Sequence, residues 1–238
     1  MSAVSLDILY EEGPCLVVNK PAGLSTQAPP GIDSLEVRVK EYYRARRETQ
    51  EGNVYLGVPH RLDRPVSGAI VFARHVRAAR RLSEQFENRL VRKIYWVCVE
   101  GLVAPGAGTW RDTLRKIPGE PRAEVVAADH AEGRPAVLHY RTLGSTDWGS
   151  WLEVELETGR MHQVRIQAAS RGWPVVGDTH YHATTTFGPL IEDPRGRAIA
   201  LHARALEFRH PMTREEVKVV APVNSSWSNL LPTGLSEI

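Results

Sequence analysis

A single acidic residue, Asp63, stands among basic residues in the stretch His60-Arg61-Leu62-Asp63-Arg64, which has prolines at positions 59 and 65. Proline fixes its own φ and keeps the preceding residue out of the helical region, so the stretch predicts an ordered, extended or turned loop. A carboxylate close to an arginine has a lowered pKa, which suits a nucleophile or a base. The alternative is an aspartate that only caps its own turn. Asp63 is the first candidate for chemistry.

Other catalytic patterns find less support. His180-Tyr181-His182, with His162 and Asp178, suggests a metal site, but there is no His-Glu-x-x-His helix and no clear third ligand. The cysteines, Cys15 and Cys98, form no Cys-x-x-Cys pair. The sequence also has no Gly-x-Ser-x-Gly elbow and no second carboxylate placed for glycoside hydrolysis. We therefore expect no metal.

The chain of 238 residues is 42% hydrophobic, enough to bury a sizeable core in one domain or in two fused lobes. Its formal net charge is only +2, but residues 74–93 carry seven basic side chains against two acidic ones. Residues 38–47 are also basic. A local positive excess favours phosphate binding, although a solvated helix face is the alternative.

The sequence predicts a cytoplasmic protein. Two widely separated cysteines suit a reducing compartment, and residues 1–13 lack the basic flank and apolar core of a secretory signal. No apolar stretch approaches the roughly 18 residues of a membrane-spanning helix, so we expect no membrane partner.

Hydrophobic periodicity predicts an α+β protein. The residues Val76, Ala79, Ser83, Phe86 and Leu90 recur at helical spacing, which places the arginines between them on an exposed face. Residues 102–150 predict hairpins separated by loops rich in glycine and proline. Strands are expected over 6–10, 15–19, 69–73, 93–100, 124–127, 136–142, 151–157, 198–208 and 217–221, and helices over 35–47, 76–90 and 162–171.

The stretch His60–Asp63, followed by Ser67-Gly68, resembles the aspartate motif of the RluA/RsuA-type pseudouridine synthases. Further segments resemble motifs of that family in the same order and span nearly the whole chain, which makes the resemblance specific. They are Lys20-Pro21-Ala22-Gly23, Lys93-x-Tyr95, Thr158–Arg165, Gly177-Asp178-x-x-Tyr181, Leu201-His202-Ala203 and His210-Pro211.

The resemblance implies isomerisation of uridine in tRNA or rRNA to pseudouridine, with no cofactor and no metal. Asp63 would be the catalytic aspartate, which either attacks C1′ or removes the 2′ proton. Arg165 would pair with Asp63, while Tyr95 would stack on the uracil and assist removal of the C5 proton. Arg61 would fill the space of an extruded uridine or grip the backbone. The resemblance also places His60 and Leu201 at the substrate.

The same resemblance implies a mixed, mainly antiparallel central sheet flanked by helices and loops. We expect one catalytic domain over residues 1–238, with a core at about 6–222, no separate S4-type RNA-binding domain, and a monomer. Residues 38–47 and 74–93 would then contact the phosphates of the RNA.

Two departures from the family pattern are Val66, where threonine is common, and Gln167, where many members have histidine. Arg64 and Val66 have no role that the sequence suggests. Two other functions stay open, a non-catalytic RNA-binding module and a hydrolase of N-glycosidic bonds. The first has no need of a carboxylate among arginines, and the second would release free base.

Overall fold

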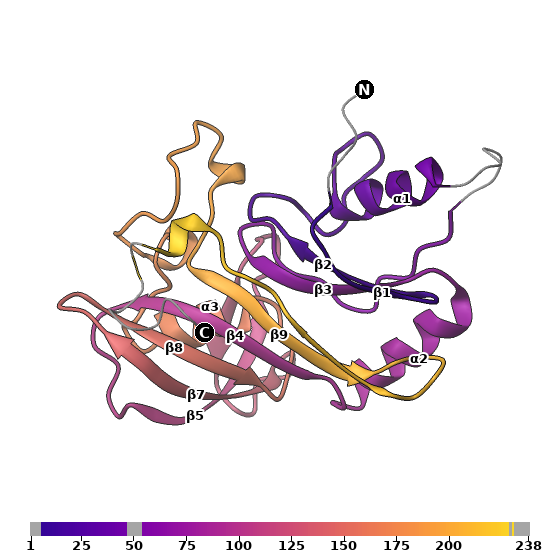
Figure 1. The fold of residues 1–238 in the computed structure, drawn as a ribbon. Coiled ribbons are helices and arrows are strands. Elements are labelled where there is room, and N and C mark those ends of the chain that lie inside the picture. The colour runs from indigo at the N-terminus through magenta and orange to yellow at the C-terminus, as the bar shows by residue number, and fades with distance from the viewer. Residues whose placement is uncertain (1–5, 47–53, 229, 231–238) are drawn as a thin grey trace. The chain divides into compact units, whose positions relative to one another are not determined.

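The computed structural model describes residues 6–46, 54–228 and 230 (Figure 1). It divides the chain into two compact units. The first unit holds Met1–Arg92 and Ala203–Pro222, and the second holds Lys93–His202 and Val223–Ile238. Helices and antiparallel strands occur in both units, so the predicted α+β class is confirmed. A single catalytic domain stays a prediction.

Strands make up most of the regular structure. In the first unit, β1, β2 and β3 pair antiparallel in chain order, β9 lies next to β3, and β9 forms an antiparallel hairpin with β10. These strands are β1 (Ile8–Glu12), β2 (Cys15–Lys20), β3 (Ser67–Ala73), β9 (Leu201–Arg209) and β10 (Glu216–Val220).

The strands of the second unit follow the spatial order β4-β8-β7-β5-β6, and every neighbouring pair is antiparallel. They are β4 (Arg92–Glu100), β5 (Ala107–Lys116), β6 (Ala123–Val126), β7 (Arg134–Ser145) and β8 (Gly149–Leu156). The sequence does not predict β5, because it begins in a Gly-rich stretch and only Trp110 and Leu114 are buried. Its pairing with β7 and β6 stabilises it instead.

Three α-helices are described, α1 (Leu35–Ala45), α2 (Val76–Glu87) and α3 (Gln163–Ala169). Side chains cap the first two: Ser34 Oγ accepts from Val37 N at 3.3 Å, and His75 Nδ1 accepts from Ala78 N at 3.1 Å. None of the described helices is long and apolar enough to cross a bilayer.

The predicted apolar stripe of α2 is wrong at its ends. Val76 and Leu90 are 65% and 69% exposed, because Val76 is the first helical residue and Leu90 lies beyond the end of α2. The buried face is instead formed by Ala78, Ala79, Leu82 and Gln85.

Each unit has its own buried apolar core. The core of the first unit includes Val17 and Val71 of neighbouring strands and Leu82 of α2. The core of the second unit is built around indole rings, with Trp96 and Trp151 edge to face and their ring centroids 4.9 Å apart.

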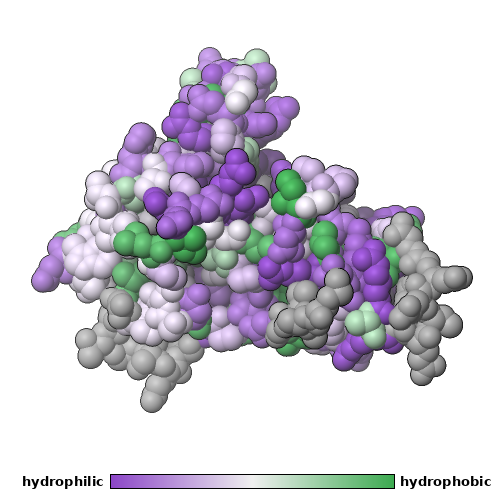
Figure 2. All heavy atoms as spheres, turned by 90° about the horizontal axis from the view of Figure 1, so that it is seen from above, coloured by the Kyte–Doolittle hydropathy of each residue, from purple (hydrophilic) through white to green (hydrophobic). Residues whose placement is uncertain are grey.

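Figure 2 shows a face on which hydrophilic side chains predominate and hydrophobic ones form small separate groups.

Strands β3 and β9 approach each other closely at Gly68. Its φ is 116°, and a Cβ there would lie 2.3 Å from the carbonyl oxygen of Ala203. We predict that Gly68→Ala lowers the free energy of unfolding by roughly 3–5 kcal/mol, because a backbone clash adds to conformational strain.

Gly31→Ala is the matched control. Gly31 also has a positive φ, of 85°, but nothing lies within 4 Å of the position that a Cβ would occupy. The expected loss is about 1–2 kcal/mol, from backbone strain alone. Urea unfolding measures both variants, and equal losses would contradict the steric explanation.

Candidate active site

Asp63 lies in the loop that leads into β3 of the first unit, and it is half-buried. Val66 N donates to Asp63 O at 3.1 Å, which closes a turn after the aspartate. Val66 itself is only 2% exposed. The apolar residue that departs from the family pattern therefore anchors this turn in the core.

The residue before Asp63 is fixed by a side chain from another loop. Thr26 Oγ1 accepts from Leu62 N at 3.1 Å and donates to Leu62 O at 2.8 Å. Both Thr26 and Leu62 are buried. The peptide groups on the N-terminal side of Asp63 therefore have little freedom to move.

The residue after Asp63, Arg64, is held through its backbone and its side chain. Its carbonyl oxygen accepts from Gly23 N at 2.8 Å and from Lys20 Nζ at 3.2 Å. Its Nε donates to Ser25 Oγ at 2.9 Å. Arg64, for which the sequence suggests no role, thus fixes the loop of Asp63 to the segment 20–26.

Lys20 is fully buried at the end of β2. Besides Arg64 O, its Nζ donates to the carbonyl oxygens of Leu24 at 2.7 Å and Pro21 at 2.9 Å. Burial lowers the pKa of Lys20 to about 7, and the nearby charge of Asp63 opposes this shift. The Lys-Pro-x-Gly segment therefore places an amine with a strongly perturbed pKa beside the candidate catalytic aspartate.

The other residues predicted in this loop differ in their surroundings. Val71 N donates to His60 Nε2 at 3.0 Å, and the His60 ring stacks on Phe86 at 4.4 Å. These contacts hold the imidazole within the fold of the first unit. Arg61 is exposed. Contacts of His60 and Arg61 with a substrate stay predictions.

Arg165, on α3 of the second unit, is 3% exposed. Its Nε donates to Asp178 Oδ2 at 2.6 Å and its Nη2 donates to Asp178 Oδ1 at 2.8 Å. The guanidinium also lies over the Tyr181 ring, 5.1 Å from its centroid. Bidentate bonding by a buried carboxylate fixes the plane of the guanidinium.

Tyr181 is itself held by polar contacts. Its hydroxyl accepts from Ala123 N at 2.8 Å and lies 2.9 Å from His162 Nδ1. The Gly177-Asp178-x-x-Tyr181 segment therefore supplies two side chains that contact Arg165. The sequence does not predict that this segment contacts Arg165. Its aspartate and histidines suggest a metal site instead. Among the described residues, no group of three or more histidine, cysteine, aspartate or glutamate side chains could hold a metal ion.

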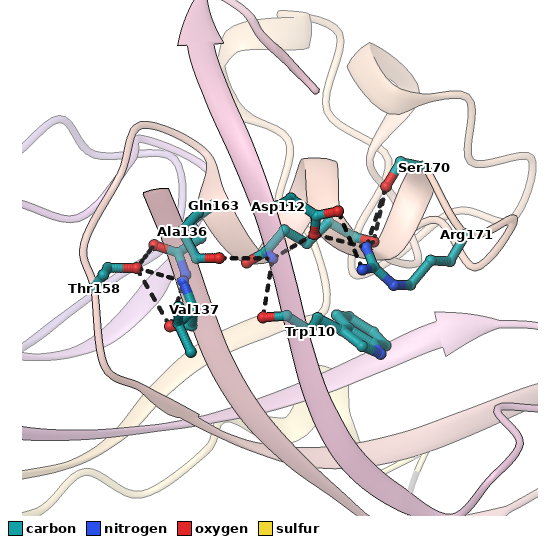
Figure 3. A network of polar contacts seen from close by, with 9 residues as sticks. Trp110, Asp112, Ala136, Val137, Thr158, Gln163, Ser170 and Arg171 are labelled. Carbon is teal, nitrogen blue, oxygen red and sulfur yellow. Dashed lines mark hydrogen bonds and ion pairs between the residues drawn. The ribbon is translucent and has the colours of Figure 1, made fainter. Parts of the chain in front are cut away.

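Two glutamines anchor α3, the helix that carries Arg165. Gln163 Oε1 accepts from Thr158 Oγ1 at 2.7 Å, and Gln163 Nε2 donates to a carbonyl of β7 at 3.1 Å (Figure 3). Gln167 Nε2 donates to Asp112 Oδ2 on β5 at 2.6 Å. Gln167 thus attaches α3 to the strands of the second unit.

Tyr95 is half-buried on β4, where it pairs with Val154 of β8. Leu201 is buried at the start of β9. Tyr95, Arg165 and Leu201 belong to the second unit, because the first unit takes up β9 only from Ala203 onward, whereas Asp63 belongs to the first. The pairing of Arg165 with Asp63, and substrate contacts of Tyr95 and Leu201, stay predictions.

Comparison with known proteins agrees with the family resemblance. A model of the RNA pseudouridylate synthase family matches residues 14–170. The chain is 34% identical over 229 residues to an uncharacterized RNA pseudouridine synthase of Synechocystis sp., covering 96% of this chain and 68% of that protein. It is 35% identical over 234 residues to ribosomal large subunit pseudouridine synthase D of Xanthomonas campestris, covering 96% and 69%.

Among solved structures, human RNA pseudouridylate synthase domain containing 4 is similar, with a TM-score of 0.75 and 22% sequence identity. The match covers 94% of this chain and 92% of that one. At this identity the likeness shows a shared fold.

The ion pair between Arg165 and Asp178 generates a stability prediction. Asp178→Asn removes the buried negative charge that holds the Arg165 guanidinium through two hydrogen bonds, so we expect the free energy of unfolding to fall by roughly 3–5 kcal/mol. The control is Glu153→Gln, which removes the partner of Arg141 from a pair whose arginine side chain is 62% exposed. That loss should stay below about 1 kcal/mol. Similar urea midpoints for the two variants would show that the buried pair contributes no more to stability than the exposed one.

Lys20 generates a prediction about pH. Its pKa is about 7 in the folded protein and 10.5 in its ordinary state, so the unfolded chain binds more protons between these values. The stability of the wild type should therefore rise from pH 7 to pH 10 relative to Lys20→Met, by at most about 1.4 kcal/mol per pH unit. Urea unfolding across this range measures the difference, and a constant difference would disprove the linkage.

Proposed function

The chain belongs to the RNA pseudouridylate synthase family, and from this we propose that Asp63 is the residue that drives its conversion of uridine to pseudouridine. The enzyme is an isomerase that acts on RNA. In the reaction the N1–C1′ bond of the target uridine breaks, the uracil turns, and C5 bonds to C1′. The proton on C5 leaves and N1 gains one, so the product is an isomer of the substrate.

The observation that carries the proposal is the fixed loop around Asp63. Hydrogen bonds from Thr26 and Lys20 hold the residues on both sides of the aspartate. A group that attacks C1′ or removes the 2′ proton gains rate from being held in position before the substrate arrives. The fixed loop supports either route for the Asp63 carboxylate.

Arg165 is proposed to pair with Asp63 and to keep its carboxylate anionic and aimed. Asp178 receives hydrogen bonds from Nε and Nη2 of Arg165. The opposite edge of the guanidinium carries the donors of Nη1, which suit a second carboxylate. The buried Arg165–Asp178 pair thus supports a preset orientation for this contact.

The remaining roles concern the substrate. We propose that Tyr95 stacks on the uracil and assists loss of the C5 proton, with His60 and Leu201 nearby. A uridine in paired or stacked RNA must be extruded at a cost of a few kcal/mol, and aromatic stacking offsets part of that cost. Exposed Arg61 is suited to occupy the vacated space or to bind the backbone.

The proposed substrate is a structured tRNA or rRNA. The name of the Xanthomonas campestris relative, a ribosomal large subunit pseudouridine synthase, supports rRNA. Two buried free thiols, Cys15 and Cys98, fit the proposed cytoplasmic location. The monomeric state stays a prediction.

Asp63→Asn tests the proposal. We expect this nearly isosteric variant to bind RNA but to release no tritium from RNA labelled at C5 of uridine, because it lacks the anionic carboxylate. In cells that lack the gene, at least one position of tRNA or rRNA should lose pseudouridine, and only the wild-type gene should restore it.

The products separate the remaining alternatives. A hydrolase would release free uracil and leave an abasic site, whereas the isomerase leaves pseudouridine in an unbroken chain. Full turnover by Asp63→Asn would remove Asp63 from the chemistry. Wild-type protein that binds RNA without forming pseudouridine in any cellular RNA would favour a non-catalytic binding module.

A further inference from the structure

Two arginines of the first unit have a backbone conformation that usually belongs to glycine. Arg89, just beyond α2, has a φ of 57°, and Arg214, in the turn between β9 and β10, has a φ of 73°. A residue with a Cβ loses stability in this left-handed region, and glycine would avoid the loss. Both side chains are exposed, so burial does not explain why arginine stands at these two positions. Such strain points to a role for the side chain.

The turn that carries Arg214 is ordered by a buried histidine. His210 is 2% exposed, and its Nδ1 accepts from Thr213 N at 3.1 Å. Arg214 N donates to His210 O at 3.0 Å. These bonds fix the backbone of the turn and thereby the direction in which Arg214 leaves it.

The turn is also attached to α2, which lies beside it in Figure 1. Arg81 Nη1 donates to Pro211 O at 2.7 Å. Gln85 bonds the backbone of Arg209 twice, with Nε2 donating to O at 2.9 Å and Oε1 accepting from N at 2.8 Å. Helix and hairpin therefore present their outer side chains on one fixed surface.

That surface is strongly basic. Arg77, Arg80 and Arg81 of α2 together with Arg214 form what we call the arginine face. Desolvation and then the charges of Arg77, Arg214 and Arg80 lower the pKa of Arg81, so these three arginines repel the Arg81 guanidinium. Glu84 offsets only part of this charge, through an exposed pair with Arg80 at 3.5 Å.

The basic character continues past Arg214. A groove of about 530 Å³ in the same unit is lined by Arg214 and by the cationic residues Arg92, Arg209 and Lys218. Glu207 and Glu216 line it too, and Glu207 pairs with Arg92 at 3.2 Å. Cations still outnumber acids, so a polyanion placed along this side meets net attraction.

We propose that the arginine face is a docking surface for the phosphate backbone of the substrate RNA, outside the target uridine. The proposal rests on the proposed function only in taking RNA as the substrate. A guanidinium offers paired donors to phosphate oxygens, and a bound phosphate offsets the repulsion that Arg81 receives from the other three arginines. The sequence predicts phosphate contacts from α2, and the structure adds the strained turn of the β9–β10 hairpin.

Arg214→Gly is the decisive variant, because it removes the charge and relieves the backbone strain together. We expect its unfolding midpoint to equal or exceed that of the wild type, while its affinity for RNA falls several-fold. The slope of log affinity against log salt should decrease by about 0.7–0.9, the value for one lost phosphate contact. On C5-tritiated RNA, KM should rise with kcat unchanged. Binding is measured by anisotropy with a labelled oligouridylate and a labelled RNA hairpin.

Two further variants complete the test. Arg214→Lys keeps the charge and the strain, and it should retain most of the affinity. Arg141→Gln removes one exposed charge from β7 of the second unit and should leave the salt slope unchanged. If Arg141→Gln weakens binding as much as Arg214→Gly does, only overall charge matters and the proposal is overturned.

The outcome is separable from that of the proposed function. Wild-type affinity and salt slope in Arg214→Gly overturn the arginine face even when tritium release is normal. Loss of affinity in Arg214→Gly supports the face even when the wild type releases no tritium, a result that would count against the proposed function alone. The two RNA probes show whether single-stranded or paired backbone is bound.

Discussion

One buried amine, that of Lys20, joins the end of β2 to the loop of Asp63 in the first unit. Lys20 Nζ lies among three backbone carbonyl oxygens, and one of these belongs to Arg64, the residue after Asp63. Burial of an amine disfavours its charge, which is why its pKa is so low. The three backbone oxygens compensate the cost of burying the amine only while the loop keeps its position. The burial of Lys20 and the position of the loop that carries Asp63 therefore depend on each other.

The second unit also buries a basic side chain, but here a carboxylate holds it in place of backbone carbonyl oxygens. Arg165 is buried against Asp178, and a buried ion pair rarely stabilises a fold more than apolar residues of similar size would. What the pair provides is orientation, because two hydrogen bonds fix the guanidinium plane. Each unit thus holds a charged group in a fixed direction at a cost in stability, as functional sites commonly do.

Local rules predict the parts of this protein that depend on local chemistry. Pro59 and Pro65 predict the ordered loop of Asp63, and alternating apolar residues predict β8, because both signals act within a few residues. The predicted stripe of α2 is wrong at its ends, since sequence periodicity does not show where Arg89 takes a left-handed conformation. The sequence does not predict β5, because this strand is stabilised by pairing with strands that are distant in sequence. The partner of Arg64, Ser25, is equally non-local.

The first unit carries a carboxylate, Asp63, which repels phosphates, and the arginine face, which attracts them. A carboxylate repels the phosphates of RNA, and the repulsion grows as water is excluded. The hydroxyl of Thr26 fixes the loop of Asp63 through neutral hydrogen bonds, which add no charge beside the carboxylate. In the proposed arginine face, attraction for the RNA backbone comes from the arginines of α2 and from Arg214. The two proposals together assign binding and chemistry to different residues, so RNA affinity could change without altering the carboxylate.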